Sequence, residues 1–339
     1  MKLPPKLLRR ILIDPAVVLG VVLAVLSLPV WLVVASFASR YVPGEWRILR
    51  LAWFLFLYLM VETAGLIVMF LAWIASGFGW KLRSRRFTAF HYWLLGWILR
   101  TVVRSGQATF KLQVLRDGDR PATSEGERSR SILVLSRHAG PGDSFLLIDG
   151  LVNGFRRDPR IVLKEFLQWD PAVDVILNRL PVSFVPAGRR GGESTIESIS
   201  DLARTMDVND AFVIFPEGAN YTEGRRARAI QKLREIGRPD LAERAEDLKQ
   251  TLPPRSAGVM TALAAAPESD VFFIGHAGLE AFVTAGDIWR AMPMDTSVAV
   301  KFWHVRAEDI PPPEQQELWL YDTWGEIDTW ISSKLAQTG

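Results

Sequence analysis

The chain contains no cysteine. This absence excludes disulfide bridges, thiolate metal sites and a cysteine nucleophile, and it fits a reducing compartment. Histidine is also scarce, and the four residues are spread over the whole chain at positions 91, 138, 276 and 304. Scattered histidines without cysteine do not form the spacings of a metal site. We therefore expect no bound metal.

Several common site motifs are missing as well. The chain has no Gly-x-x-x-x-Gly-Lys and no Gly-x-Gly-x-x-Gly, the two glycine-rich patterns that cradle nucleotide phosphates. It also lacks Gly-x-Ser-x-Gly, the usual sign of an α/β-hydrolase. The basic residues cluster beside apolar segments and no nucleic-acid module is present. We expect no cofactor and no nucleic-acid partner.

Long apolar runs, in contrast, dominate the N-terminal part of the chain. No charged residue lies between Asp14 and Arg40, and the second run, from Leu51 to Trp80, carries only Glu62. About 20 apolar residues suffice to cross the hydrocarbon layer, and a signal peptide would have a shorter apolar core. We predict a membrane hairpin in residues 1–86, with transmembrane helices at about 15–39 and 51–80.

Lysine and arginine positions predict the orientation of this hairpin. The outer clusters hold four basic residues each, against three between the two runs: Lys2, Lys6, Arg9 and Arg10; Lys81, Arg83, Arg85 and Arg86; Arg40, Arg47 and Arg50. The positive-inside rule then places both outer clusters, and everything after residue 80, in the cytoplasm. We expect a protein integral to the cell (inner or plasma) membrane with a cytoplasmic catalytic domain at 107–339. The aromatic-rich stretch 87–106 reads as an interfacial amphipathic helix, with a third span as the alternative and His91 as an interface residue.

An apolar run that stops at His138 and restarts at Asp143 organises the rest of the chain. Residues 132–135 read as a buried strand, and glycines and a proline at 140–142 end it before a helix that starts at about Asp143. So tight a loop can return the Asp143 carboxylate to the His138 imidazole, which fixes the tautomer and leaves the other ring nitrogen free as a base. The alternative is a structural histidine beside a helix terminus.

Two other strand ends carry candidate binding groups. Arg189 and Arg190 lie on a glycine-rich turn between a strand at 180–186 and a helix, where backbone N–H groups and a guanidinium favour an oxyanion such as phosphate. A solvated turn is the alternative. Glu217 and Gly218 follow the strand 211–215, and open α/β sheets bind ligands at such ends. A simple strand-end turn is the alternative there.

Strands and helices alternate through residues 107–339. The expected strands lie near 111–114, 132–135, 160–163, 180–186, 211–215, 271–275 and 298–303. This alternation predicts an α/β fold with a mainly parallel sheet flanked by helices. His276 and His304 follow strands without a carboxylate at motif spacing, so we expect packing roles for both.

Together these residues resemble the glycerophospholipid acyltransferase family, which includes 1-acylglycerol-3-phosphate acyltransferases. His138 to Asp143 matches its His-x4-Asp motif and Phe215 to Gly218 its Phe-Pro-Glu-Gly block. The longer blocks Phe215 to Glu223 and Leu252 to Gly258 look like those of the lysocardiolipin and lysophosphatidylinositol acyltransferase branch. Ala219 departs from the family's usual threonine, and the region around His276 departs from its valine-proline block.

The resemblance implies a function and a set of roles. His138 would deprotonate an acceptor hydroxyl, Asp143 would orient His138, and the hydroxyl oxygen would attack acyl-CoA or acyl-ACP directly, without a cofactor. Arg189 or Arg190 would hold the acceptor phosphate. Glu217 and Gly218 are similar to the family's acceptor-site residues, and Arg255, a further substrate-binding candidate, matches the later arginine of the branch. The expected reaction converts 1-acyl-sn-glycerol 3-phosphate to phosphatidic acid at the bilayer. Alternatives are lysocardiolipin, lysophosphatidylinositol or a glycolipid as acceptor, or a non-catalytic membrane lipid-binding protein.

Overall fold

A computed structural model describes residues 3–118, 129–140, 142–185, 191–280 and 285–338. The chain divides into two compact units, each described by itself. Unit 1 comprises Met1–Gln113, Leu163–Gly191 and Trp289–Thr296, and unit 2 comprises Val114–Val162, Gly192–Ile288 and Ser297–Gly339. The chain therefore enters unit 1 three times, twice by excursions from the α/β part.

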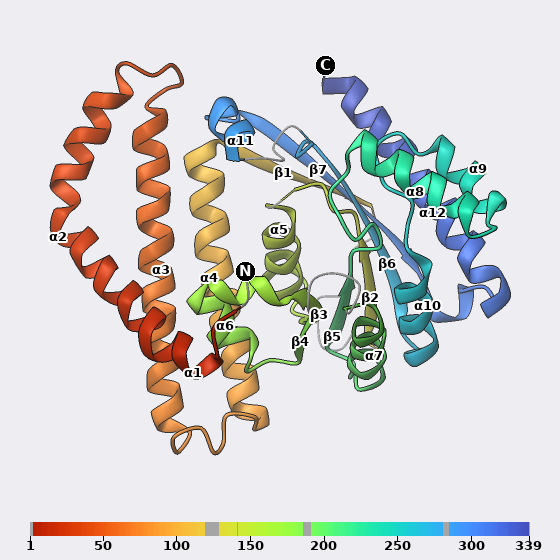
Figure 1. The fold of residues 1–339 in the computed structure, drawn as a ribbon, viewed down its shortest axis with the longest axis horizontal. Coiled ribbons are helices and arrows are strands. Elements are labelled where there is room, and N and C mark those ends of the chain that lie inside the picture. The colour runs from red at the N-terminus through yellow and green to blue at the C-terminus, as the bar shows by residue number, and fades with distance from the viewer. Residues whose placement is uncertain (1–2, 119–128, 141, 186–190, 281–284, 339) are drawn as a thin grey trace. The chain divides into compact units, whose positions relative to one another are not determined.

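Unit 1 is built on long helices. A short helix α1 (Lys6–Leu8) and a π-helical turn (Arg9–Ile13) run into α2 (Asp14–Ser39), which is followed by α3 (Arg47–Ala75) and α4 (Arg85–Phe110) (Figure 1). The first excursion, Leu163–Gly191, adds a 3-10 turn (Glu165–Trp169), α6 (Pro171–Leu177) and β4 (Val182–Val185). The helical stretches Lys6–Ser39 and Arg47–Ala75 are long and apolar enough to be candidate membrane spans.

The structure changes two details of the helix prediction. The second long helix ends at Ala75, and the apolar residues up to Trp80 lie in a turn, because Gly77 and Gly79 adopt positive φ values of 74° and 101°. His91 on α4 is fully buried, and its ring nitrogens contact the Phe87 carbonyl oxygen at 2.5 Å and the Arg179 guanidinium at 2.9 Å. The prediction of His91 as an interface residue is therefore wrong.

The sheet has seven strands in the order β1-β7-β6-β2-β5-β3-β4. The strands other than β4 are β1 (Leu112–Gly118), β2 (Ile132–Ser136), β3 (Asp158–Lys164), β5 (Asp210–Ile214), β6 (Asp270–Ala277) and β7 (Thr296–Val305). The pairs β2–β5, β2–β6 and β3–β5 are parallel, whereas β6–β7 is antiparallel. The predicted mainly parallel α/β sheet is confirmed, and β2 lies at its centre with all five residues buried, as expected of a strand covered on both faces.

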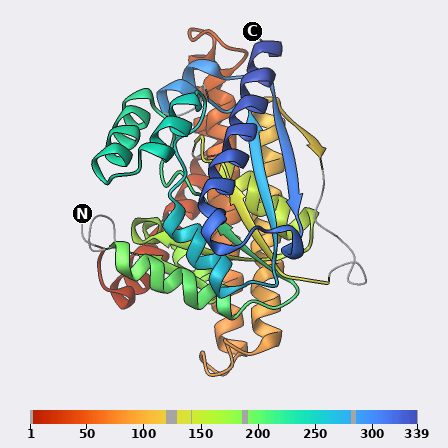
Figure 2. The ribbon, with the colours of Figure 1, turned by 90° about the vertical axis from the view of Figure 1, so that its right-hand side faces the viewer.

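Helices of unit 2 cover this sheet. One face packs against α7 (Gly191–Arg204), α10 (Ser256–Ala265) and α12 (Pro313–Thr338), through a core that includes Leu135, Phe212, Phe273, Leu263 and Trp324. Figure 2 shows α12 running beside β6 and β7. The remaining elements are α5 (Asp143–Asp149), a π-helical turn (Gly150–Gly154), α8 (Glu223–Glu235), α9 (Pro239–Asp247), α11 (Ala285–Ala291) and a 3-10 turn (Ala307–Asp309). This packing holds the carboxyl end of β2 in place.

Candidate functional site

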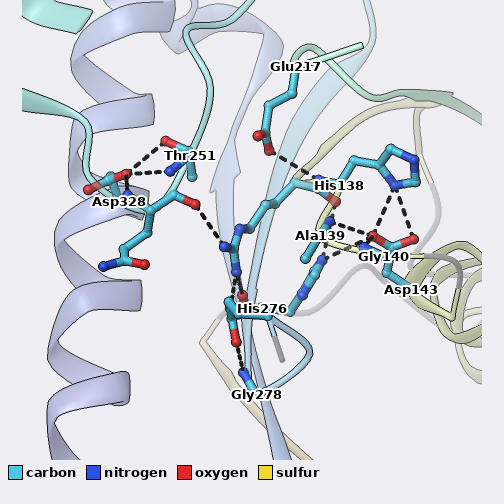
Figure 3. A network of polar contacts seen from close by, with 12 residues as sticks. His138, Ala139, Gly140, Asp143, Glu217, Thr251, His276, Gly278 and Asp328 are labelled. Carbon is cyan, nitrogen blue, oxygen red and sulfur yellow. Dashed lines mark hydrogen bonds and ion pairs between the residues drawn. The ribbon is translucent and has the colours of Figure 1, made fainter. Parts of the chain in front are cut away.

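His138 lies two residues beyond the end of β2, on the loop that leads to α5. Its Nδ1 atom is 3.0 Å from Asp143 Oδ2 and 3.1 Å from Oδ1, so the contact expected from the spacing is present. The ring packs on Phe215 with 4.8 Å between centroids, and the side chain stays 26% exposed. The second ring nitrogen points away from Asp143 (Figure 3). The imidazole is thus held by one nitrogen and open at the other.

Asp143 is the buried partner of this pair. Its carboxylate also accepts hydrogen bonds from the backbone N–H groups of Ala139 at 2.7 Å and Gly140 at 3.1 Å, and from the Ser144 hydroxyl at 3.1 Å. Burial by itself raises the pKa of Asp143, but the His138 hydrogen bond, the nearby imidazoles and the Gly140 amide outweigh it and hold the pKa below its usual value. Asp143 is therefore ionised at neutral pH and fixes the loop as well as the imidazole.

Glu217 follows β5 and faces inward. Its Oε1 atom accepts the backbone N–H of His138 at 3.1 Å and its Oε2 atom accepts that of Leu252 at 2.9 Å. Only 2% of the residue is exposed. Burial raises the pKa of Glu217 to about 7, although the Leu252 amide, the Arg137 charge and the His138 amide favour the ionised form. The geometry ties β5, His138 and Leu252 together, and substrate contact by Glu217 stays a prediction.

Gly218 and Arg255 lie against each other beside Glu217. Gly218 has a φ of +65°, and a Cβ atom there would approach the Arg255 guanidinium carbon to 3.0 Å. The Arg255 backbone N–H donates to the Pro216 carbonyl oxygen at 2.9 Å, which ties the Arg255 backbone to the turn that contains Gly218. Arg255 is exposed, and among the described residues its guanidinium has no hydrogen-bond or ion-pair partner. A residue with a side chain at position 218 would displace this cation.

Arg137, immediately before His138, is a site residue that the sequence analysis missed. It is 1% exposed, and its guanidinium donates to the carbonyl oxygens of His276 at 2.6 Å and Gln250 at 2.8 Å and pairs with the Glu280 carboxylate. Burial of an arginine requires such partners. The available signal was a cation directly after an apolar strand, with no carboxylate near it in sequence.

Asp328 on α12 anchors the loop that meets Glu217. Its carboxylate accepts the backbone N–H groups of Lys249, Gln250 and Thr251 at 2.7–2.9 Å and the Thr251 hydroxyl at 2.9 Å. Figure 3 shows this carboxylate on α12 facing Thr251 on one side of the network, with His138 and Asp143 on the other. Asp328 was not among the predicted site residues, and the available signal was an aspartate among the apolar residues of the C-terminal helix.

His276 contacts the same cluster. Its Nε2 atom lies 3.3 Å from the Arg137 carbonyl oxygen and 3.7 Å from Asp143 Oδ2, and the residue is 5% exposed. Burial, followed by the Arg137 charge, lowers the pKa of His276 to about 4, so the ring is neutral at pH 7. His276 is thus part of the polar network as well as packed. His304 pairs with Asp270 at 2.9 Å and stacks on Phe272.

Arg189 and Arg190 lie outside the described residues. The structure therefore brings together five of the seven predicted site residues in two adjoining groups: His138 with Asp143, and Glu217 with Gly218 and Arg255. Within the described part of the chain, no group of three or more His, Cys, Asp or Glu residues could hold a metal ion.

Comparison with known proteins bears on this cluster. Residues 119–273 match the family model described as Acyltransferase. The matched segment contains all five described site residues, whereas His276, Glu280 and Asp328 lie beyond its end. The match names the family alone, so the lysocardiolipin and lysophosphatidylinositol branch stays a prediction. No curated protein and no solved structure matched the chain.

Proposed function

We propose that the chain transfers a fatty acyl group from acyl-CoA or acyl-ACP to the free hydroxyl of a lysophospholipid. The preferred acceptor is 1-acyl-sn-glycerol 3-phosphate, and the product is then phosphatidic acid. One observation carries the proposal: within a segment that matches the Acyltransferase model, His138 is held by an ionised carboxylate at 3.0 Å and keeps its other nitrogen open. An imidazole in this state is suited to take a proton from an alcohol.

The residues in place support a direct transfer. His138 Nε2 accepts the hydroxyl proton while the Asp143 carboxylate stabilises the imidazolium that forms. The acceptor oxygen attacks the thioester carbonyl carbon, and the tetrahedral intermediate collapses with cleavage of the carbon–sulfur bond. The thiolate then takes the proton back from His138. Since no covalent acyl-enzyme forms, the absence of cysteine from the chain is no obstacle.

The acceptor phosphate has a candidate partner in Arg255. Its exposed guanidinium packs over Gly218, next to the Glu217 carboxylate that holds the His138 backbone. Guanidinium groups bind phosphate oxygens in a bidentate manner. Arg189 and Arg190 are further candidates from the sequence.

The decisive experiment measures thiol release from acyl-CoA by the purified full-length chain in detergent. We expect release only when a lysophospholipid is present. His138→Ala should reduce the rate by about 10² to 10⁴, in line with the loss of a general base. His304→Ala is a matched control, because His304 pairs with Asp270 and plays no part in the proposed chemistry. Full activity of His138→Ala would refute the mechanism.

A panel of acceptors tests the head group in the same assay. Lysophosphatidic acid, lysocardiolipin, lysophosphatidylinositol and a glycolipid compete for the enzyme, and kcat/KM ranks them. Preference for an acceptor other than lysophosphatidic acid would replace the proposed substrate while keeping the reaction. Tight lipid binding without turnover by any donor would favour a non-catalytic lipid-binding protein.

A further inference from the structure

The register between β2 and β6 brings a second histidine to the level of His138. The two strands are parallel and Ser136 pairs with Ile274; the next backbone N–H, that of Arg137, donates to the Ile274 carbonyl oxygen at 3.0 Å. His138 and His276 each follow this last pair by two residues. Both histidines therefore lie at the carboxyl edge of the sheet, where open α/β sheets place their functional groups. All of these residues belong to unit 2.

One carboxylate oxygen contacts both imidazole rings. Asp143 Oδ2 is 3.0 Å from His138 Nδ1 and 3.7 Å from His276 Nε2. The second separation is longer than a hydrogen bond, so His276 acts on Asp143 as a neighbouring dipole. The side chain of His138 is partly exposed, whereas that of His276 is buried. His276 can therefore influence a reaction at His138 only through Asp143.

The proton of the neutral His276 ring lies on Nε2. This atom is 3.3 Å from the Arg137 carbonyl oxygen, which can only accept a hydrogen bond. The other nitrogen, Nδ1, is buried and has no hydrogen-bond partner among the described residues, so a second proton would have no acceptor there. The ring thus presents a fixed N–H dipole at the edge of the site.

The charges around His276 keep this ring neutral. Burial and the Arg137 guanidinium, which donates to the His276 carbonyl oxygen at 2.6 Å, lower the pKa of His276. The Asp143 and Glu280 carboxylates act in the opposite direction and do not offset this. On β7 the residue paired with His276 is Val300, which carries no charge. His276 therefore adds no second positive charge beside His138.

We propose that His276 is a positioning residue that tunes His138 through Asp143. Its Nε2–H group turns the positive end of a dipole toward the carboxylate and balances part of the Asp143 charge. The imidazolium that forms at His138 then gains less from Asp143 and releases its proton more readily. His138 stays unprotonated, and so able to accept the hydroxyl proton of the acceptor, down to a lower pH. This inference rests on the proposed function, because it assigns His276 to that proton transfer.

Two substitutions of His276 separate tuning from packing. His276→Leu supplies an apolar side chain of similar size and removes the N–H group, and such volume-conserving changes are well tolerated. The Arg137 carbonyl oxygen keeps a partner in this variant, because the Ser136 hydroxyl donates to it at 3.1 Å. His276→Gln is the conservative variant, because it retains an N–H group and does not titrate. His276→Met, which is also apolar, takes the place of His276→Leu if that variant does not fold.

The pH dependence of thiol release measures the tuning in the purified full-length chain. The pH at which kcat/KM falls to half on the acidic side should rise in His276→Leu by about half a unit, or about threefold in proton affinity. A full charge would produce a shift of about one unit or more. His276→Gln should restore the wild-type profile. An unshifted profile in His276→Leu, or an equal shift in both variants, would overturn the proposal.

His304→Leu is the matched control for this measurement. His304 also contacts a carboxylate, that of Asp270 at 2.9 Å, but Asp270 pairs with Ile132 at the opposite end of β2. The same loss of an imidazole there should leave the pH profile of kcat/KM unchanged. A shift in His304→Leu as large as that in His276→Leu would show that the effect does not pass through Asp143, and would also overturn the proposal.

NMR of the histidine rings tests the coupling without turnover. The chain has four histidines, so ¹³C-labelled histidine gives four ring signals, and the signal missing from His138→Ala is that of His138. The His138 ring should become protonated at a higher pH in His276→Leu than in the wild type. Identical titrations would overturn the inference even if the enzyme is active. A shifted titration in a chain that releases no thiol with any acceptor would refute the proposed function alone.

Discussion

Asp328 offers a sharp test of how the site is held, because it lies outside the segment that matches the Acyltransferase model. Its carboxylate is 3% exposed and accepts four hydrogen bonds from residues 249–251. Asp328→Ala leaves three amides and one hydroxyl without their acceptor. Asp328→Asn keeps the shape but presents an NH2 group to N–H donors. Both variants should therefore disturb the loop without touching His138.

The expected loss of stability follows from the donors left without an acceptor. Hydrogen bonds to a charged group contribute about 1.5–3 kcal/mol each, and water entering the loop restores part of that. We therefore expect Asp328→Ala to lower the free energy of unfolding by about 3–5 kcal/mol. This is a large share of the roughly 5–15 kcal/mol that stabilises a domain. Unit 2 should melt at a clearly lower temperature.

Asp328→Ala should also slow the reaction. The loop supplies the Leu252 amide to Glu217 and the Gln250 carbonyl to Arg137, and Glu217 in turn holds the His138 backbone. A displacement of about 1 Å at a reacting group can cost about 10² in rate. We expect kcat to fall by about 10- to 100-fold while KM for the thioester changes little, since Asp328 is buried and its carboxylate is already bonded to residues 249–251.

Thermal unfolding in detergent and thiol-release kinetics measure the two effects on the same samples. Glu326→Ala is the matched control, because Glu326 lies on the exposed side of α12, two residues away. The kinetics are run well below the melting temperature of each variant. A stable but slow Asp328→Asn supports a positioning role. Wild-type kcat in Asp328→Ala, or an unchanged melting temperature, would contradict the reasoning.

Three other variants have defined outcomes. Glu217→Gln places an NH2 group against the backbone N–H of either His138 or Leu252. We expect kcat to fall by about 10-fold or more while lipid binding persists. An unchanged kcat would refute the role of Glu217 in holding the His138 backbone. Arg255→Ala should raise KM for a phosphate acceptor more than for the thioester, with Arg255→Lys intermediate; equal changes in both KM values count against phosphate binding. Burial lowers the pKa of His276 to about 4, so the unfolded chain takes up a proton between pH 6.5 and 4 that the folded chain does not. The free energy of unfolding should therefore fall by about 3 kcal/mol as the pH drops through this window. The melting temperature of His276→Gln should therefore fall less between pH 7 and 5 than that of the wild type. Equal falls in the two proteins would refute the lowered pKa of His276.

Local sequence rules predicted the sheet and the central pair well. The parallel strands β2, β5 and β6 each contain a short apolar run followed by serine, proline or glycine, and β2 shows this pattern without interruption. The pairing of His138 with Asp143 also needed only the four loop residues between them. Such features depend on neighbours in the sequence, and for that reason they could be predicted.

The support of the site could not be predicted in this way, because its members come together only through the fold. The Arg137 guanidinium meets carbonyl oxygens 113 and 139 residues further along the chain, and Asp328 reaches Thr251 across 77 residues. The predicted substrate contact of Glu217 rested on its place at a strand end, yet both its oxygens accept backbone amides. Residues beyond position 273 thus hold the motif residues in place. If so, a chain cut back to residues 119–273 should retain the motifs and lose the activity.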